Sequence, residues 1–250
     1  MKSLAKGSIG LMVFALLMTP LLLSLGFWQL DRAEEKQQLI DKQSHGETEQ
    51  FIELAEVRLG DQENDWSYRT VSVSGHYRAN EYLLLDNRTR DGRVGYEVIS
   101  LFKTDEGKVL LVNRGWVKAP SHRDELPTIT SDLIETLVNI KITGAIYFPS
   151  NQVFTLSDEH IPQGWPKRIQ KLDIDALSKA LGQGEDIYPF TVRLSDNSQP
   201  GALQTGWKIS TMSPDKHFGY AVQWFSLALV LVVMTALAIR KMGENKTDDS

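Results

Sequence analysis

Two long runs without a charged residue, one at each end of the chain, constrain its fold more than any other feature. The first extends from Gly7 to Leu30 and the second from Phe218 to Ile239. At a rise of about 1.5 Å per residue, roughly twenty apolar residues in a helix cross a hydrocarbon core of about 30 Å. The two runs therefore predict transmembrane helices at 7–30 and 217–239.

The first run is expected to stay in the protein rather than to be removed as a signal peptide. Its apolar core, 9–25, is longer than the roughly 7–15 residues of a typical signal peptide. No small-x-small cleavage site follows it, because the chain continues as Gly26-Phe-Trp-Gln-Leu-Asp-Arg. Pro20 lies inside the run and is expected to kink the helix, which a neighbouring helix can accommodate.

Basic residues outside the two runs predict their orientation. Two lysines precede the first run, and the second run ends on Arg240 and Lys241. Since Lys and Arg are enriched in cytoplasmic segments, residues 1–6 and 240–250 are expected in the cytoplasm. Residues 31–216 then lie on the other side of the membrane. In a Gram-negative bacterium that side is the periplasm, so the expected arrangement there is a multi-pass protein of the bacterial cell inner membrane with this central domain in the periplasm.

The composition of the chain limits what the central domain can be. It is long enough to bury one core as a single domain. The net charge of −5 gives no support for nucleic acid as a partner, and the lipid bilayer is the expected surroundings of both apolar runs. The chain has no cysteine, which excludes disulfides, thiol redox chemistry, thiolate metal sites and covalent haem attachment through cysteines.

Between the spans the sequence pattern is mainly that of β-strands. Alternation of apolar and polar residues and short apolar runs predict strands at 70–74, 82–86, 95–103, 108–117, 137–148, 153–156, 188–194 and 207–210. Asp91-Gly92 is the sharpest predicted turn, and Thr104-Asp-Glu-Gly is expected to close a hairpin.

Two helices are expected beside these strands. Charges at i, i+3 and i+4 spacing predict that 31–44 continues the first span outward. The segment 173–182 predicts a short helix, with Asp173 as its N-cap and Gly182 as its C-terminal stop. The predicted fold is thus an α+β membrane protein, in which two transmembrane helices flank one mainly antiparallel β domain.

The start of the second span contains the strongest candidate site. It is His217-Phe-Gly-Tyr-Ala-Val-Gln-Trp-Phe. In a helix, His217, Tyr220 and Trp224 share one face, and Gln223 lies in the same turns. Polar groups at this depth are tolerated where they face protein, water or a ligand, which makes them functional candidates. An aromatic belt at the interface, with a solvated histidine, explains the same residues, and both interpretations stay open.

No catalytic constellation accompanies this site. The chain lacks Gly-x-Ser-x-Gly, His-Glu-x-x-His, a phosphate-binding loop and Gly-x-Gly-x-x-Gly, so we expect no enzyme. His76 and His122 are expected at the surface. The clusters 86–88 and 113–116 end two predicted strands with polar groups. Networks that satisfy loops are commoner at strand ends than binding sites, which favours a structural role for both clusters.

Four motifs, in this order, resemble the Surfeit locus protein 1 family, membrane factors for cytochrome c oxidase assembly. They are Gly26-Phe-Trp-Gln-Leu-Asp-Arg-Ala-Glu-Glu-Lys, Asp86-Asn-Arg-Thr-Arg-Asp-Gly-Arg-Val-Gly-Tyr-Glu-Val, Leu111-Val-Asn-Arg-Gly-Trp-Val and His217-Phe-Gly-Tyr-Ala-Val-Gln-Trp-Phe. The chain departs from the family at Ser100-Leu101, where members often have a proline before the leucine. Its segment 144–149 is a loose version of another family motif. Both departures lie in the β domain.

The resemblance implies a role in providing or retaining haem a for the oxidase subunit that carries it. In bacterial relatives a haem-binding role is attributed to the histidine at the position of His217, and imidazole is a good axial ligand of haem iron. His217 is therefore the expected metal ligand. The surrounding residues implied as haem contacts are Tyr220, Gln223, Trp224, Trp28 and Arg32. An i,i+3 ion pair with Glu35 is the favoured alternative for Arg32.

The same resemblance names the expected partners. They are the haem-bearing subunit of cytochrome c oxidase and, as further candidates, the enzymes of haem a synthesis. Two other classes of function remain open. The protein is either a scaffold that holds assembly intermediates without binding haem, or a membrane-tethered periplasmic enzyme whose nucleophile and base are not evident in the sequence.

Overall fold

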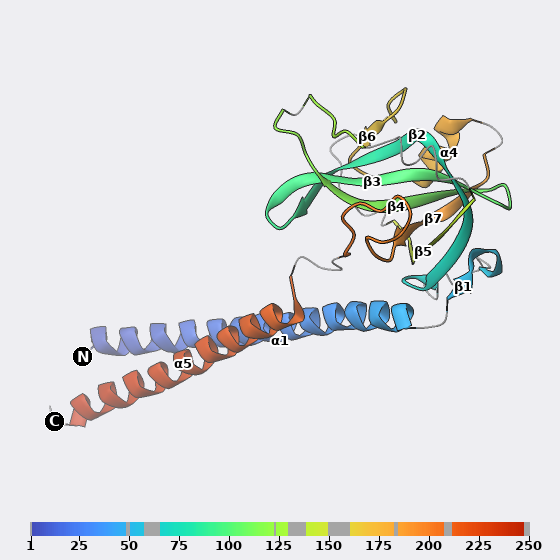
Figure 1. Ribbon diagram of the computed structural model, residues 1–250. Helices are drawn as coiled ribbons and strands as arrows, with labels where there is room; N and C mark the ends of the chain where they lie inside the picture. Colours follow the sequence, from blue (N-terminus) through green and yellow to red (C-terminus); the bar gives the residue numbers. More distant parts are fainter. Residues whose placement is uncertain are drawn as a thin grey trace. The chain divides into compact units, whose positions relative to one another are not determined.

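The computed structural model divides the chain into two compact units, a helical unit of residues 1–41 and 208–250 and a β unit of residues 42–207 (Figure 1). The structure describes residues 2–48, 51–57, 66–122, 124–129, 139–149, 161–182, 185–207 and 212–247.

The helical unit contains the two predicted terminal helices, except for the end of the first one from Lys42 onward. Helix α1 is Lys2–Thr48 and helix α5 is Pro214–Thr247. Both are long and apolar enough to cross a membrane, over Ile9–Gly46 and Pro214–Met242, with mean hydropathies of 2.2 and 2.3 in their most apolar windows. Only 11% of each window is buried, so most of these side chains face outward, unlike those of a core helix. Helix α1 continues through Pro20 and includes the predicted extension 31–44.

Small residues line the contact between α1 and α5. Up to residue 242 of α5, where burial is described, the buried residues are Ala221, Ala228 and Thr235, and their spacing of seven is typical of helices packed along one seam. On α1, Ala15 and Gly26 are buried. A Cβ atom on Gly26 would lie 2.5 Å from the ring of Phe225, so the absence of a side chain lets this ring approach the α1 backbone.

The β unit is built around a closed circuit of five strands. These are β2 (Thr70–Arg90), β3 (Arg93–Thr104), β4 (Val109–Lys118), β7 (Ile187–Leu194) and β5 (Ile140–Tyr147), and β5 pairs back onto β2. Closure is possible because β2 is long: residues 70–75 pair with β5, and 75–90 pair with β3. Among the described strands of this circuit, closure leaves no long edge free to pair with another chain.

Strand β2 differs from its prediction. The sequence predicts two strands, 70–74 and 82–86, whereas the structure has one strand of 21 residues. Its pairing with β3 shifts register between 77 and 82 and between 85 and 88. Asn80 and Asn87 take left-handed backbone conformations there, with φ of 60° and 57°. Bulges of this kind bend a strand without ending it, which explains why the local pattern suggested two elements.

The predicted turns and hairpins are confirmed. Asp91 and Gly92 form the two-residue loop between β2 and β3, both with positive φ, as tight hairpins require. Strands β3 and β4 pair antiparallel, with Leu101 opposite Leu111. Helix α4 (Ile174–Leu181) begins at the predicted cap, where the Asp173 carboxylate accepts a 2.8 Å hydrogen bond from the Ala176 amide.

Parallel strand pairs were not predicted, and two predicted strands lie wholly or mostly outside the described residues. Strands β1 (Ile52–Glu53) and β6 (Lys167–Ile169) pair parallel to β2, and β4 pairs parallel to β7, so the sheet is mixed. The predicted strand 153–156 lies outside the described residues. Of the predicted strand 207–210 only Trp207 is described, and it is not in a strand.

Three apolar clusters pack against the sheet, and the two larger ones cover its two faces. One contains a buried residue from each strand of the circuit and so fills its interior: Val71, Phe102, Leu110, Ile146 and Phe190. The other joins residues of the opposite face, including Leu101 and Leu111, to Leu177 of α4. Because both faces of the sheet are buried here, β4 begins with consecutive apolar residues and does not alternate apolar with polar ones.

Candidate functional site

His217 lies in the first turns of α5 and contacts α1. Its side chain is half-buried, and its Nδ1 is 2.8 Å from Oε1 of Gln29, a residue 188 positions earlier in the chain. A carbonyl oxygen accepts hydrogen bonds, so the contact is made by the tautomer in which Nδ1–H donates to Gln29. The other ring nitrogen, Nε2, then keeps its lone pair and is available as a ligand.

Aromatic packing fixes the two helices beside this hydrogen bond. The rings of Phe27 and Phe225 meet edge to face, with centroids 5.3 Å apart and planes at 73°. Phe225 is also the ring that approaches Gly26. Edge-to-face pairs contribute about 0.5–1.5 kcal/mol beyond the area that they bury. The histidine and its partner amide are therefore held by a defined contact between helices.

The predicted α5 residues separate into two groups. His217 and Trp224 are half-buried and lie on the side of α5 that includes the buried Ala221. Tyr220 is 44% exposed, and Gln223 is exposed as well. The structure therefore brings His217 and Trp224 toward α1 and leaves Tyr220 and Gln223 on the outer surface of the helix pair.

The predicted α1 residues are exposed. Trp28 is 48% exposed, and the Arg32 guanidinium lies 6.0 Å from the centre of its ring. Arg32 also forms the expected i,i+3 ion pair with Glu35. The α1 residue that contacts His217 is Gln29, which the sequence indicated as a residue of the membrane interface and of a family motif, but not as the partner of His217. Its spacing of three from the buried Gly26 is the signal that places it on the inward face.

The polar cluster at the end of β4 joins strands to a loop. Arg114 is only 3% exposed; its Nε donates to the Gly201 carbonyl at 2.6 Å and its Nη1 to the Ser100 hydroxyl at 3.3 Å. Its guanidinium lies 5.5 Å from the centre of the Tyr77 ring, and burial lowers the pKa of Arg114. The Trp116 indole donates to the Arg88 carbonyl at 2.7 Å. These contacts agree with the structural role expected for both strand-end clusters.

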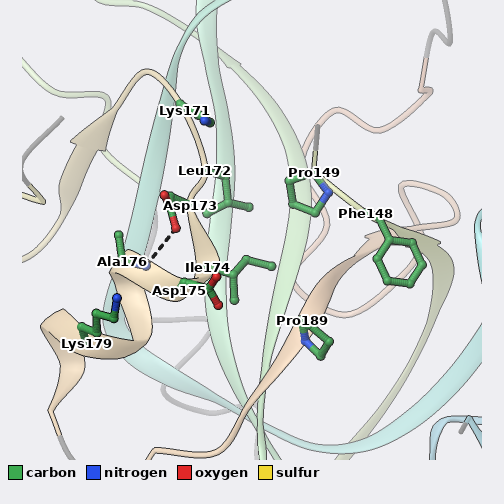
Figure 2. Close-up of a pocket in the computed structure, with 10 residues that line it drawn as sticks. All are labelled: Phe148, Pro149, Lys171, Leu172, Asp173, Ile174, Asp175, Ala176, Lys179 and Pro189. Atoms are coloured by element: carbon green, nitrogen blue, oxygen red, sulfur yellow. Dashed lines mark hydrogen bonds between the residues drawn. The ribbon is translucent and has the colours of Figure 1, made fainter. Parts of the chain in front are cut away.

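A separate open groove of about 740 Å³ lies at the start of α4 (Figure 2). Its lining residues are Phe148, Pro149, Lys171, Leu172, Asp173, Ile174, Asp175, Ala176, Lys179 and Pro189. Figure 2 shows the Asp173 carboxylate bonded to the Ala176 amide, so this acid serves the helix as its cap. The lining combines lysines with aspartates and does not favour one charge of ligand.

The other histidines that the structure describes do not form a second site. His45, His76 and His122 are exposed, as expected for the last two, and His160 lies outside the described residues. In the part of the chain that the structure describes, no three His, Asp or Glu side chains are grouped so as to hold a metal ion. The contact between α1 and α5 is therefore the site that best matches the sequence motifs.

Comparison with known proteins shows what the chain is similar to. Residues 16–229, which include both Gln29 and His217, match the model of the SURF1 family. A SURF1-like protein of Rickettsia conorii is 27% identical over 226 residues, which cover 88% of each chain. One of Dictyostelium discoideum is 26% identical over 253 residues, 87% of this chain and 92% of that protein. The Saccharomyces cerevisiae protein named Cytochrome oxidase assembly protein SHY1 is 33% identical over 105 residues, 40% of this chain and 27% of its own.

Proposed function

The chain belongs to the SURF1 family, and on this premise we propose that it is a membrane factor for the assembly of cytochrome c oxidase. The printed name of the yeast relative, an oxidase assembly protein, supports this role. Two long apolar helices with few buried residues suit a protein that works in the membrane where an oxidase is built. The role is that of an assembly factor rather than an enzyme.

Within this role, haem a is the proposed cargo and His217 its iron ligand. The observation that supports the assignment is the half-buried imidazole at the start of α5, with Nδ1 engaged by Gln29 and Nε2 free of that hydrogen bond. Haem iron takes an axial imidazole readily. Cargo that must be passed on needs a ligand held in place by the protein yet open to the surface, and a half-buried histidine satisfies both conditions.

Exposed aromatic side chains on both helices are available to a large apolar ring. Trp28 and Tyr220 are each nearly half exposed, with Trp224 and Gln223 on the same helix as Tyr220. A flat macrocycle would replace lipid or water on these aromatic side chains. Arg32 is the candidate partner of a propionate. Its present ion pair with Glu35 is exposed and contributes only about 0.3–0.5 kcal/mol, so exchanging one carboxylate for another costs little.

The proposed topology places residues 31–216 in the periplasm and both termini in the cytoplasm. The basic flanks of the two runs support it. The antiparallel arrangement of α1 and α5 also supports it, because both chain ends lie at the same end of the helix pair (Figure 1). The proposed partners are the haem-bearing oxidase subunit and the enzymes that make haem a.

A scaffold that binds no haem is the second candidate. The same hydrogen bond favours it, because His217 and Gln29 would hold two helices together without any cargo. In that case the imidazole serves packing alone, and the aromatic residues around it form an interfacial belt.

The test compares two substitutions of His217 in protein purified in detergent after co-expression with the haem a pathway. His217→Gln removes the imidazole but keeps an amide able to bond to Gln29, and His217→Ala removes both. We expect normal abundance of the Gln variant, loss of its haem absorption and reduced haem a in the oxidase. Tyr220→Phe, which keeps the ring, is the control with little expected effect. Full haem occupancy and oxidase activity in both His217 variants would refute the ligand assignment. Absence of haem from the natural protein, with an unaffected oxidase in both variants, would leave the scaffold as the function.

A further inference from the structure

We propose that Gln29 is a positioning residue that sets which nitrogen of His217 binds iron and how firmly the cargo is held. Its amide oxygen keeps Nδ1 protonated, so that Nε2 is the ligand atom. The inference rests on the proposed function, since it concerns the same site. It goes beyond that function because it gives a residue of α1, Gln29, control over the iron ligand on α5, His217.

The geometry supports a well-formed hydrogen bond between Gln29 and His217. The Nδ1 to Oε1 distance of 2.8 Å is that of a good hydrogen bond, and both side chains are half-buried. One turn before Gln29, Gly26 admits the ring of Phe225, and that ring packs on Phe27. The backbones are thus held at the separation that the hydrogen bond needs.

The choice of an amide has a chemical consequence. Histidine ligands of metals usually donate their second N–H to a carboxylate, a carbonyl or water, which fixes the tautomer and raises the basicity of the ligand. A carboxylate is a stronger acceptor than a neutral amide oxygen. Gln29 therefore orients His217 but adds less electron density than an acid would. Moderate donation suits a protein that must release its haem to another subunit.

Two substitutions of similar size separate positioning from packing. Gln29→Leu fills the helix contact but accepts no hydrogen bond, and Gln29→Glu keeps an acceptor and strengthens it. A role in packing alone predicts that Leu is harmless. The positioning role predicts that Leu weakens haem affinity about 10- to 100-fold. It also predicts that Glu binds at least as tightly as Gln, releases haem more slowly and lowers its reduction potential.

The first measurement needs no haem. The full chain, labelled with ¹⁵N-histidine in detergent micelles, should show one imidazole with a protonated Nδ1 and an unprotonated Nε2, and this signal should be absent in His217→Gln. In Gln29→Leu the signal should shift toward a mixture of tautomers. An unchanged tautomer in Gln29→Leu would refute the inference, whatever the protein does with haem.

The second measurement uses haem a, loaded by co-expression, and follows its release to apomyoglobin and its reduction potential in the full chain. Haem affinity is expected to be highest in Gln29→Glu, intermediate in the natural protein and lowest in Gln29→Leu. Equal affinity and potential for Gln29→Leu and the natural protein would overturn the inference. Haem retention by His217→Gln would instead refute the proposed function, and the tautomer measurement would still decide the role of Gln29.

Discussion

Replacing Arg114 tests whether the polar cluster at the end of β4 is structural. The side chain is 3% exposed, and among the described residues its acceptors are the Gly201 carbonyl and the Ser100 hydroxyl rather than a carboxylate. Arg114→Ala removes both hydrogen bonds and the contact with Tyr77. Arg114→Met removes the same hydrogen bonds but keeps most of the side-chain volume.

The expected losses of unfolding free energy differ because Arg114→Ala leaves a larger cavity than Arg114→Met. A hydrogen bond from a charged donor contributes about 1.5–3 kcal/mol, and an unsatisfied buried acceptor costs about 1–3 kcal/mol. The alanine variant adds a cavity, while both variants gain from no longer burying a charge. We expect a loss of about 3–5 kcal/mol for Arg114→Ala and about 1–2 kcal/mol for Arg114→Met. At roughly 2–4 °C per kcal/mol for a domain of this size, Tm falls by about 12 °C and about 4 °C.

Thermal unfolding of the detergent-solubilised full chain, followed by near-ultraviolet circular dichroism, measures these shifts. Haem a content and activity of the oxidase, assayed in cells grown well below either Tm, measure function. If the role of Arg114 is structural, the Arg114→Met variant should still support oxidase assembly. Two results would refute this reasoning: an alanine variant as stable as the natural protein, or a stable methionine variant that no longer supports assembly. The second result would make Arg114 part of a binding site.

Two further predictions concern topology and acid stability. Alkaline phosphatase fused after residue 110 should be active and after residue 245 inactive, and the opposite pattern would refute the periplasmic placement of the β unit. Hydrogen bonds from Ser198 hold the pKa of Asp196 below its ordinary value, so its contribution to stability is complete above about pH 4 and is lost as the pH falls through the lowered pKa. Amide exchange in residues 196–205 should therefore quicken below that pH in the natural protein. The change should be absent in Asp196→Asn, and equal acid sensitivity of the two proteins would exclude Asp196 as its cause.

Local patterns in the sequence predicted the elements whose causes are local. Uncharged runs predicted α1 and α5 because a hydrocarbon core demands about twenty consecutive apolar residues whatever the rest of the chain does. Asp173 and Asp91-Gly92 predicted a helix start and a hairpin turn, since a cap and a tight turn depend on two to four neighbouring residues. The family motifs likewise identified His217 as the residue to investigate.

Contacts between distant segments were decided only in the tertiary structure. The unbroken course of β2 depends on partners on both β3 and β5, which hold the bulges at Asn80 and Asn87 within one strand. Parallel pairing of β4 with β7 likewise has no signature in either strand alone.

The candidate site also combines features with local causes and features that depend on contacts between distant segments. The sequence identified the His217 imidazole and the aromatic side chains as candidate site residues, because their chemistry belongs to single residues. It did not predict that Gln29 would be the neighbour of His217 or that Tyr220 would face outward. Those outcomes depend on how two helices pack, and the packing is set by small residues such as Gly26 and Ala221, which have no chemistry of their own. A hydrogen bond across 188 residues exists only once both helices are formed and in contact.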